Sequence, residues 1–189
     1  MSRPKFFSVT YFITVIAAVS AFIVFSGSRA STLPPVPAGP HPPSAANQQY
    51  VAAIDVARVF GRSQGCAKAD AELIIAVAVE AIKADVDPRI LAATVAIESA
   101  CDPMAVSRRG AIGITQIMPK IWMGRFDFTG SINLFNRQDN LRTGALILGG
   151  LIKQYGVAQG VRRYQGTGTD CSTCGDAYVP KILTLAGKR

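Results

Sequence analysis

The stretch Asp87-Pro-Arg-Ile-Leu-Ala-Ala-Thr-Val-Ala-Ile-Glu-Ser99 decides the fold class, because it specifies a helix with a clear start and an apolar body. Asp87 suits the N-cap and Pro88 the first helical position, so the helix is expected to run from here to about Ala100. Glu98 directly follows the apolar body, where a carboxylate is poorly hydrated. Desolvation raises the pKa of such a group, which favours a general acid.

Helices separated by Gly and Pro are expected along the rest of the 189-residue chain. Residues 73–79 are apolar all round and are expected to be buried, with a strand as the alternative for so short a run. A longer helix should bury the stripe Leu141, Ala145, Leu148, Ile152 and Tyr155, and its glycines 144, 149 and 150 should let a neighbouring helix approach closely. The predicted helices span residues 48–60, 70–84 with Asp70 as N-cap, 87–100, 136–155, 157–164 and 176–186. The fold class is therefore mainly α.

Residues 6–26 carry no charge and, as a helix, would span roughly 30 Å, the thickness of a bilayer core. They follow the short basic segment 1–5 and precede a Pro-rich linker at 27–46. The length favours an uncleaved inner-membrane anchor that places the domain at 47–189 in the periplasm. A small-x-small motif at Ser28-Arg-Ala30 leaves a cleaved signal peptide and a soluble periplasmic protein as the alternative, and a phage-encoded exported protein as another.

The net charge and the number of cysteines limit the kinds of partner and bound group that the chain can be expected to have. The net charge is +8, and once Arg3, Lys5 and Arg29 are set aside, 17 basic residues remain against 12 acidic ones. This mild excess suits an anionic polymer, whereas no basic run indicates nucleic-acid binding. An even number of cysteines in an exported domain favours disulfides, of which we expect the pairs Cys66–Cys101 and Cys171–Cys174, with a zinc site as the weaker alternative.

The inventory of catalytic side chains is short. The lone His41 lies in the linker, which excludes Ser-His-Asp and Cys-His centres from the domain. No phosphate-binding glycine motif is present, and no metal or other cofactor is expected. Glu80 also interrupts an apolar helix, but no polar loop follows it, so a salt bridge or a surface position is expected there. The remaining candidate for a catalytic side chain is Glu98, assisted by neutral polar residues.

Residues 84–183 resemble the catalytic domain of soluble lytic transglycosylases, in the lysozyme-like superfamily. The resemblance rests on ordered motifs: Glu98-Ser99, Pro103, Ser107-Arg-Arg-Gly-Ala-Ile-Gly113, Gly113-Ile-Thr-Gln-Ile-Met-Pro119, Asn140-Leu-Arg-Thr-Gly144, Tyr164-Gln-Gly166 and Tyr178-Val-Pro-Lys-Ile182. Ile114-Thr115 replaces a Leu-Met pair of the family, which is expected to make one wall of the cleft more polar. Gln165 stands where the family has Asn, and Cys171-x-x-Cys174 lies in the loop before Tyr178.

The resemblance implies that Glu98 acts as the sole acid and base on peptidoglycan glycan strands. It would protonate the oxygen between N-acetylmuramic acid and N-acetylglucosamine, and then deprotonate the muramic 6-hydroxyl to form a 1,6-anhydro end. Ser99 would orient the Glu98 carboxyl group or cap the helix. Sugar contacts would come from Gln116, Ile117, Met118, Tyr164, Gln165 and Tyr178. Gln116 can equally stabilise its own loop by hydrogen bonds. A buried tyrosine whose hydroxyl is bonded within the protein cannot be distinguished from a sugar-binding tyrosine by sequence.

Two other functions stay open at this point. A muramidase would need a second carboxylate about 5–9.5 Å from Glu98, and the sequence names no good candidate. A non-catalytic peptidoglycan-binding component of an assembly is the other alternative. The expected settings are local opening of the cell wall for a secretion or conjugation machine, phage entry or lysis, and general wall turnover.

Overall fold

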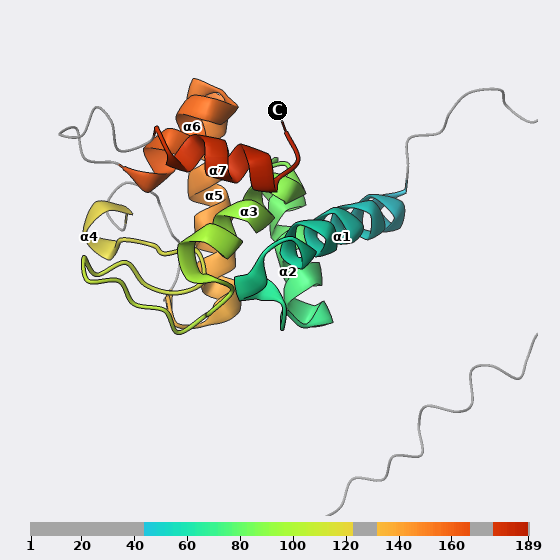
Figure 1. The fold of residues 1–189 in the computed structure, drawn as a ribbon, viewed down its shortest axis with the longest axis horizontal. Helices are drawn as coiled ribbons and strands as arrows, with labels where there is room; N and C mark the ends of the chain where they lie inside the picture. The colour runs from blue at the N-terminus through green and yellow to red at the C-terminus, as the bar shows by residue number, and fades with distance from the viewer. Residues whose placement is uncertain (1–43, 123–131, 167–175, 189) are drawn as a thin grey trace, which may run out of the picture. The chain divides into compact units, whose positions relative to one another are not determined.

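A computed structural model of the chain describes residues 44–122, 132–166 and 176–188, all within one compact unit, Pro42–Arg189. In the described ranges the regular structure is helical, and the extended backbone is limited to isolated bridges that join Val106 to Ile112 and Ile112 to Ile117. The elements are α1 (Ala45–Gly61), the 3₁₀ turn η1 (Gln64–Cys66), α2 (Ala71–Lys83), α3 (Pro88–Ser99), α4 (Pro119–Trp122), α5 (Arg137–Tyr155), α6 (Val157–Gln165) and α7 (Tyr178–Leu185) (Figure 1). The mainly α prediction is confirmed for these residues.

Side-chain caps set the helix starts. Asp70 accepts a hydrogen bond from the Leu73 amide, Asp87 from the Arg89 amide, and Asn136 from the amides of Gln138 and Asp139. These caps satisfy amides that have no partner inside the helix, which is why the sequence located α2, α3 and α5 well. The first helix begins at Ala45 rather than Gln48, because Ser44 caps it by accepting from the Asn47 amide. The short elements η1 and α4 were not predicted.

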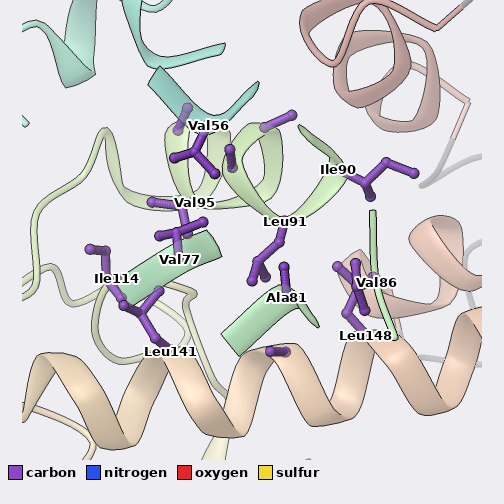
Figure 2. Packing of buried hydrophobic residues seen from close by; sticks show 14 of the residues in the cluster. Val56, Val77, Ala81, Val86, Ile90, Leu91, Val95, Ile114, Leu141 and Leu148 are labelled. Atoms are coloured by element: carbon purple, nitrogen blue, oxygen red, sulfur yellow. The ribbon is translucent and has the colours of Figure 1, made fainter. Parts of the chain in front are cut away.

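The core surrounds α3, whose residues 90–96 are all buried. This helix packs against α1, α2 and α7. Leu91 and Val95 of α3 lie among Val77 of α2, Val56 of α1 and Leu141 of α5 (Figure 2). Burial of whole aliphatic side chains contributes about 1.5–3 kcal/mol each, so this cluster fixes the position of the helix that ends at Glu98.

Three packing predictions were wrong in detail. Ile75 is 55% exposed, because α2 buries only one face and its apolar sequence continues around the other. The predicted stripe of α5 fails at Tyr155, which is 39% exposed at the end of the helix. Gly144 and Gly149 face loops instead of a helix: a Cβ at Gly144 would meet Thr115, and one at Gly149 would meet the carbonyl oxygen of Ala84. Gly150 is exposed.

The predicted membrane segment, residues 6–26, lies outside the described residues, as does most of the Pro-rich linker. Both stay predictions. Within the described ranges, no helix combines the length and hydrophobicity needed to cross a bilayer.

Candidate active site

Glu98 lies in the last turn of α3, half-buried at the edge of the core. Burial raises the pKa of its carboxyl group above the ordinary value of 4.5, because the charged form loses hydration. The hydroxyl of Tyr178 on α7 donates a hydrogen bond to Glu98 Oε1 at 2.6 Å, which opposes the rise in pKa. Burial is the larger effect, so the site favours a protonated carboxyl group that also has a hydrogen bond ready for its ionised form.

Two buried tyrosines lie on the side of Glu98 that faces α6 and α7. Burial raises the pKa of Tyr178 and of Tyr164, and the nearby Glu98 charge adds to both shifts, so both phenols stay neutral donors. Tyr164 donates to the main-chain oxygen of Thr115 at 2.8 Å. The two rings are only 5% and 7% exposed, so the structure gives them hydrogen-bonding roles within the protein rather than open faces for a sugar.

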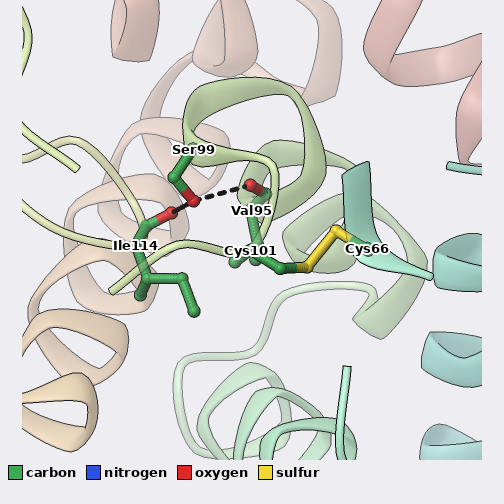
Figure 3. Close-up of a disulfide and its surroundings, with 5 residues drawn as sticks. All are labelled: Cys66, Val95, Ser99, Cys101 and Ile114. Carbon is green, nitrogen blue, oxygen red and sulfur yellow. Dashed lines mark hydrogen bonds between the residues drawn. A yellow bond between two sulfur atoms is a disulfide. The ribbon is translucent and has the colours of Figure 1, made fainter. Parts of the chain in front are cut away.

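The Ser99 hydroxyl does not orient Glu98. It donates to the main-chain oxygen of Ile114 at 2.7 Å and lies 3.2 Å from that of Val95 (Figure 3). Instead of the expected hydrogen bond to the Glu98 carboxyl group, the Ser99 hydroxyl makes a hydrogen bond that links the end of α3 to the segment 113–118. Reasoning from adjacency failed here because neighbouring side chains on a helix point about 100° apart.

Gln116 braces the same segment. Its side-chain nitrogen Nε2 donates to the main-chain oxygens of Ala105 at 3.1 Å and Gly113 at 2.9 Å. The backbone of Gln116 itself is left-handed, with φ +53°. Of its neighbours, Ile117 is buried and Met118 is half-buried, so only Met118 retains side-chain surface of the kind expected for a sugar floor. Gln165 is exposed at the end of α6. The structure thus brings Glu98 and Tyr178 into direct contact and leaves the other predicted contacts as separate surface or bracing residues.

The substitution of Ile114-Thr115 for Leu-Met does not add polarity to a cleft wall, because both residues are fully buried. The Thr115 hydroxyl donates to the side-chain oxygen of Asn140 at 2.6 Å. Asn140 also accepts from the Thr115 amide and donates to the main-chain oxygens of Ile112 and Leu134, each at 2.9 Å. Asn140 is therefore the main anchor of this segment, a role that its place in the Asn140–Gly144 motif signalled but that we did not assign.

The remaining candidates divide as follows. Glu80 is buried and accepts from Lys83 Nζ and Gln138 Nε2, each at 2.8 Å, so the expected salt bridge is present, although the position is internal. The predicted disulfide between Cys66 and Cys101 is present. Cys171 and Cys174 lie outside the described residues, so their pairing stays a prediction. Among the described side chains, no group of three or more His, Cys, Asp or Glu residues could hold a metal ion.

Comparison with protein families agrees with this geometry. Residues 76–168 match the family model of the transglycosylase SLT domain. This part of the chain is therefore a transglycosylase SLT domain, of the lysozyme-like superfamily. It contains Glu98, the segment 113–118 and Tyr164, whereas Tyr178 lies beyond the matched residues. Neither the curated proteins nor the solved structures gave a significant match to the chain.

Proposed function

We propose that the protein is a peptidoglycan lytic transglycosylase with Glu98 as its single acid and base. The observation that carries this proposal is the hydrogen bond of 2.6 Å between the neutral Tyr178 hydroxyl and the desolvated carboxyl group of Glu98, which lies within the part of the chain that matches the transglycosylase SLT domain. Such a carboxyl group keeps its proton to a higher pH than an exposed one and can release it to a basic oxygen in the transition state.

In the first step, Glu98 donates its proton to the glycosidic oxygen between N-acetylmuramic acid and N-acetylglucosamine, and the bond to the anomeric carbon breaks. The Glu98 carboxylate that results then takes the proton of the muramic 6-hydroxyl. That oxygen attacks the anomeric carbon and closes the 1,6-anhydro ring, so Glu98 ends the cycle protonated. Tyr178 stabilises the transient carboxylate by its hydrogen bond, while burial stabilises the acid form.

The electrostatic surroundings of Glu98 support one carboxylate rather than two. Burial and the hydroxyl of Tyr178 are the causes that shift its pKa, and no other carboxylate of the described residues is among them. A hydrolase of the two-carboxylate type would place a second Asp or Glu within about 5–9.5 Å. Asp127 and Asp170 lie outside the described residues, so the identity of the product decides the matter.

Product analysis tests this proposal directly. Purified sacculi digested with the protein should release muropeptides that end in 1,6-anhydro-muramic acid, which lack one water relative to reducing ends and are separated by mass spectrometry. Reducing ends throughout would contradict the proposal and identify a muramidase. Binding to sacculi with no released fragments would identify a non-catalytic component of an assembly.

The proposal extends to the cellular setting. A single small catalytic domain behind residues 6–26 and a Pro-rich linker suits an enzyme held at the inner membrane that opens the wall locally in the periplasm. The partners in this proposal are the glycan strands, the inner membrane and a secretion, conjugation or phage assembly. Fractionation of cells that express the full chain tests the anchor, since a cleaved protein would appear in the soluble periplasmic fraction.

Tyr178→Phe should lower kcat by about 10-fold to 100-fold, because it removes a hydrogen bond to a charged group worth about 1.5–3 kcal/mol. The Tyr178 hydroxyl lowers the pKa of Glu98, so its removal should raise that pKa further. The acid form would then persist to higher pH, and the alkaline limb of the pH–rate profile should move to higher pH. The rate of release of anhydro-muropeptides between pH 4 and 9 measures both effects.

Tyr155→Phe is the matched control, because Tyr155 is 39% exposed, lies at the end of α5 and is not among the causes that shift the pKa of Glu98. It should leave both the rate and the profile unchanged. An unshifted alkaline limb in Tyr178→Phe would show that the observed hydrogen bond does not act on the catalytic carboxyl group.

A further inference from the structure

The chain makes an unusual turn directly after Glu98 and Ser99. Ala100 has φ +54° and Cys101 has φ +67°, so two consecutive residues with side chains adopt the left-handed region. Non-glycine residues adopt this conformation only where surrounding contacts hold them. The backbone that leaves α3 therefore depends on contacts outside the helix, and Glu98 lies two residues before Ala100, where this turn begins.

The contacts that hold the turn come from η1. Cys101 is joined to Cys66 by the disulfide, and Cys66 is buried in the core at 2% exposure (Figure 3). Gly65 lies against Ala100 so closely that a Cβ at Gly65 would come within 2.5 Å of the Ala100 Cβ. The covalent bond and the close packing thus fasten the end of α3 from one side, while the Ser99 hydroxyl ties it to Ile114 from the other.

We propose that the Cys66–Cys101 disulfide is a positioning element for Glu98, which keeps the last turn of α3 in the shape that holds the carboxyl group against Tyr178. The proposal rests on the function proposed above. Without the disulfide, Ala100 and Cys101 can return to ordinary backbone conformations, and the last helical turn can fray. Glu98 would then gain hydration and lose its contact with Tyr178, while the segment 113–118 keeps its own anchors on Asn140 and Tyr164.

The disulfide can be reached by a small reductant. Cys101 is half-buried and lines a hollow of about 420 Å³ together with Gly65, Ala100 and Asp102. A dithiol such as dithiothreitol would attack a sulfur through its thiolate and transfer two electrons and two protons in all. The protein would gain the thiols of Cys66 and Cys101, and the reagent would become its cyclic disulfide. Full activity would then be reached only where an oxidising environment has formed this bond.

The experiment uses the full chain with Cys171→Ser and Cys174→Ser, so that Cys66 and Cys101 form the only possible pair. The oxidised form is compared with the form reduced by dithiothreitol and with a variant that also carries Cys66→Ser and Cys101→Ser. Reduction should lower kcat by about 10-fold to 100-fold with little change in KM, because a misplacement of about 1 Å at a catalytic group can cost that much. Equal kcat in the oxidised and reduced forms would overturn the proposal.

The pKa of Glu98 separates positioning from general stability. The titratable groups that interact with Glu98 in the described part of the chain are Tyr178 and Tyr164, both neutral, so its pKa reports its hydration. A ¹³C-detected titration of the carboxyl group should show its pKa falling toward 4.5 upon reduction. The alkaline limb of the pH–rate profile should move to lower pH by the same amount. An unchanged pKa in folded, reduced protein would overturn the proposal.

This titration also separates the two proposals, since it needs no activity. An oxidised protein that releases no anhydro-muropeptides would refute the proposed function, whereas the pKa shift would still test positioning. If reduction unfolds the chain, Gly65→Ala serves instead, because it displaces Ala100 while the disulfide remains. It should lower the pKa of Glu98, whereas Gly61→Ala, which meets nothing within 4 Å, should not. Identical pKa values in these two variants would overturn the proposal.

Discussion

Replacing Glu98 with Gln is expected to lower the rate of glycan cleavage by roughly 10²–10⁴-fold, the usual contribution of general acid–base catalysis. Gln has nearly the same shape and keeps an oxygen that can accept the Tyr178 hydrogen bond, but it has no proton of the required acidity. Release of 1,6-anhydro-muropeptides from sacculi measures the loss. Cleavage at the wild-type rate would refute the role of Glu98.

The same substitution should stabilise the fold above pH 5. Because burial raises the pKa of Glu98, the folded chain binds more protons there than the unfolded chain, whose carboxyl group titrates near 4.5. Wild-type stability from this group is therefore fully present below pH 4.5 and is lost as the pH rises through the higher folded pKa. The variant lacks this loss, so its thermal midpoint should rise relative to that of wild type as the pH passes from 4.5 through the folded pKa of Glu98, and the difference should level off at higher pH. Such a result would also prove that the inactive variant is folded.

Glu72→Gln is a suitable control, because Glu72 is exposed on α2 and pairs with Arg137 at the surface. It should keep full activity, and its thermal midpoint should show no comparable gain with rising pH, since an exposed ion pair contributes only about 0–1 kcal/mol.

Asn140→Ala is expected to destabilise the fold by about 3 kcal/mol or more. The Asn140 side chain is fully buried, and its removal would leave the Thr115 amide and the main-chain oxygen of Leu134 unpaired, while the Ile112 oxygen would keep only the hydrogen bond from the Ile117 amide. Each buried polar group left unpaired costs about 1–3 kcal/mol, against a total stability of about 5–15 kcal/mol for an ordinary domain. Denaturant unfolding followed by circular dichroism measures the loss.

Asn133→Ala provides the comparison for Asn140→Ala. Its side chain accepts a hydrogen bond from the Phe135 amide in an exposed turn, where water can replace it. It should therefore cost about 1 kcal/mol or less. Equal losses in the two variants would show that Asn140 does not anchor the segment 113–118.

Local signals accounted for most of the helical framework. Asp70, Asp87 and Asn136 each cap a helix that the sequence predicted, because capping depends on residues only two or three positions apart. The position of Glu98 at the end of an apolar helix was likewise predictable, and the structure raises its pKa by the expected cause, desolvation.

Contacts between distant residues were harder to predict. The hydrogen bond between Tyr178 and Glu98 joins residues 80 positions apart, and Ser99 turned away from its neighbour toward Ile114. Both depend on how α3, α7 and the segment 113–118 pack, which no local pattern encodes. The exposure of Ile75 had a similar origin, since the apolar run of α2 continues past the face that the core covers.

The segment 112–115 is held in place through its main chain, because the side chains of Ser99, Asn140 and Tyr164 all donate hydrogen bonds to its main-chain oxygens. A backbone held in this way keeps its course when its own side chains change, provided that they fill the same space. Among descendants of a common ancestor, the three donors should thus persist while positions such as 114 drift, and directed evolution should find this stretch more permissive than its closeness to Glu98 suggests.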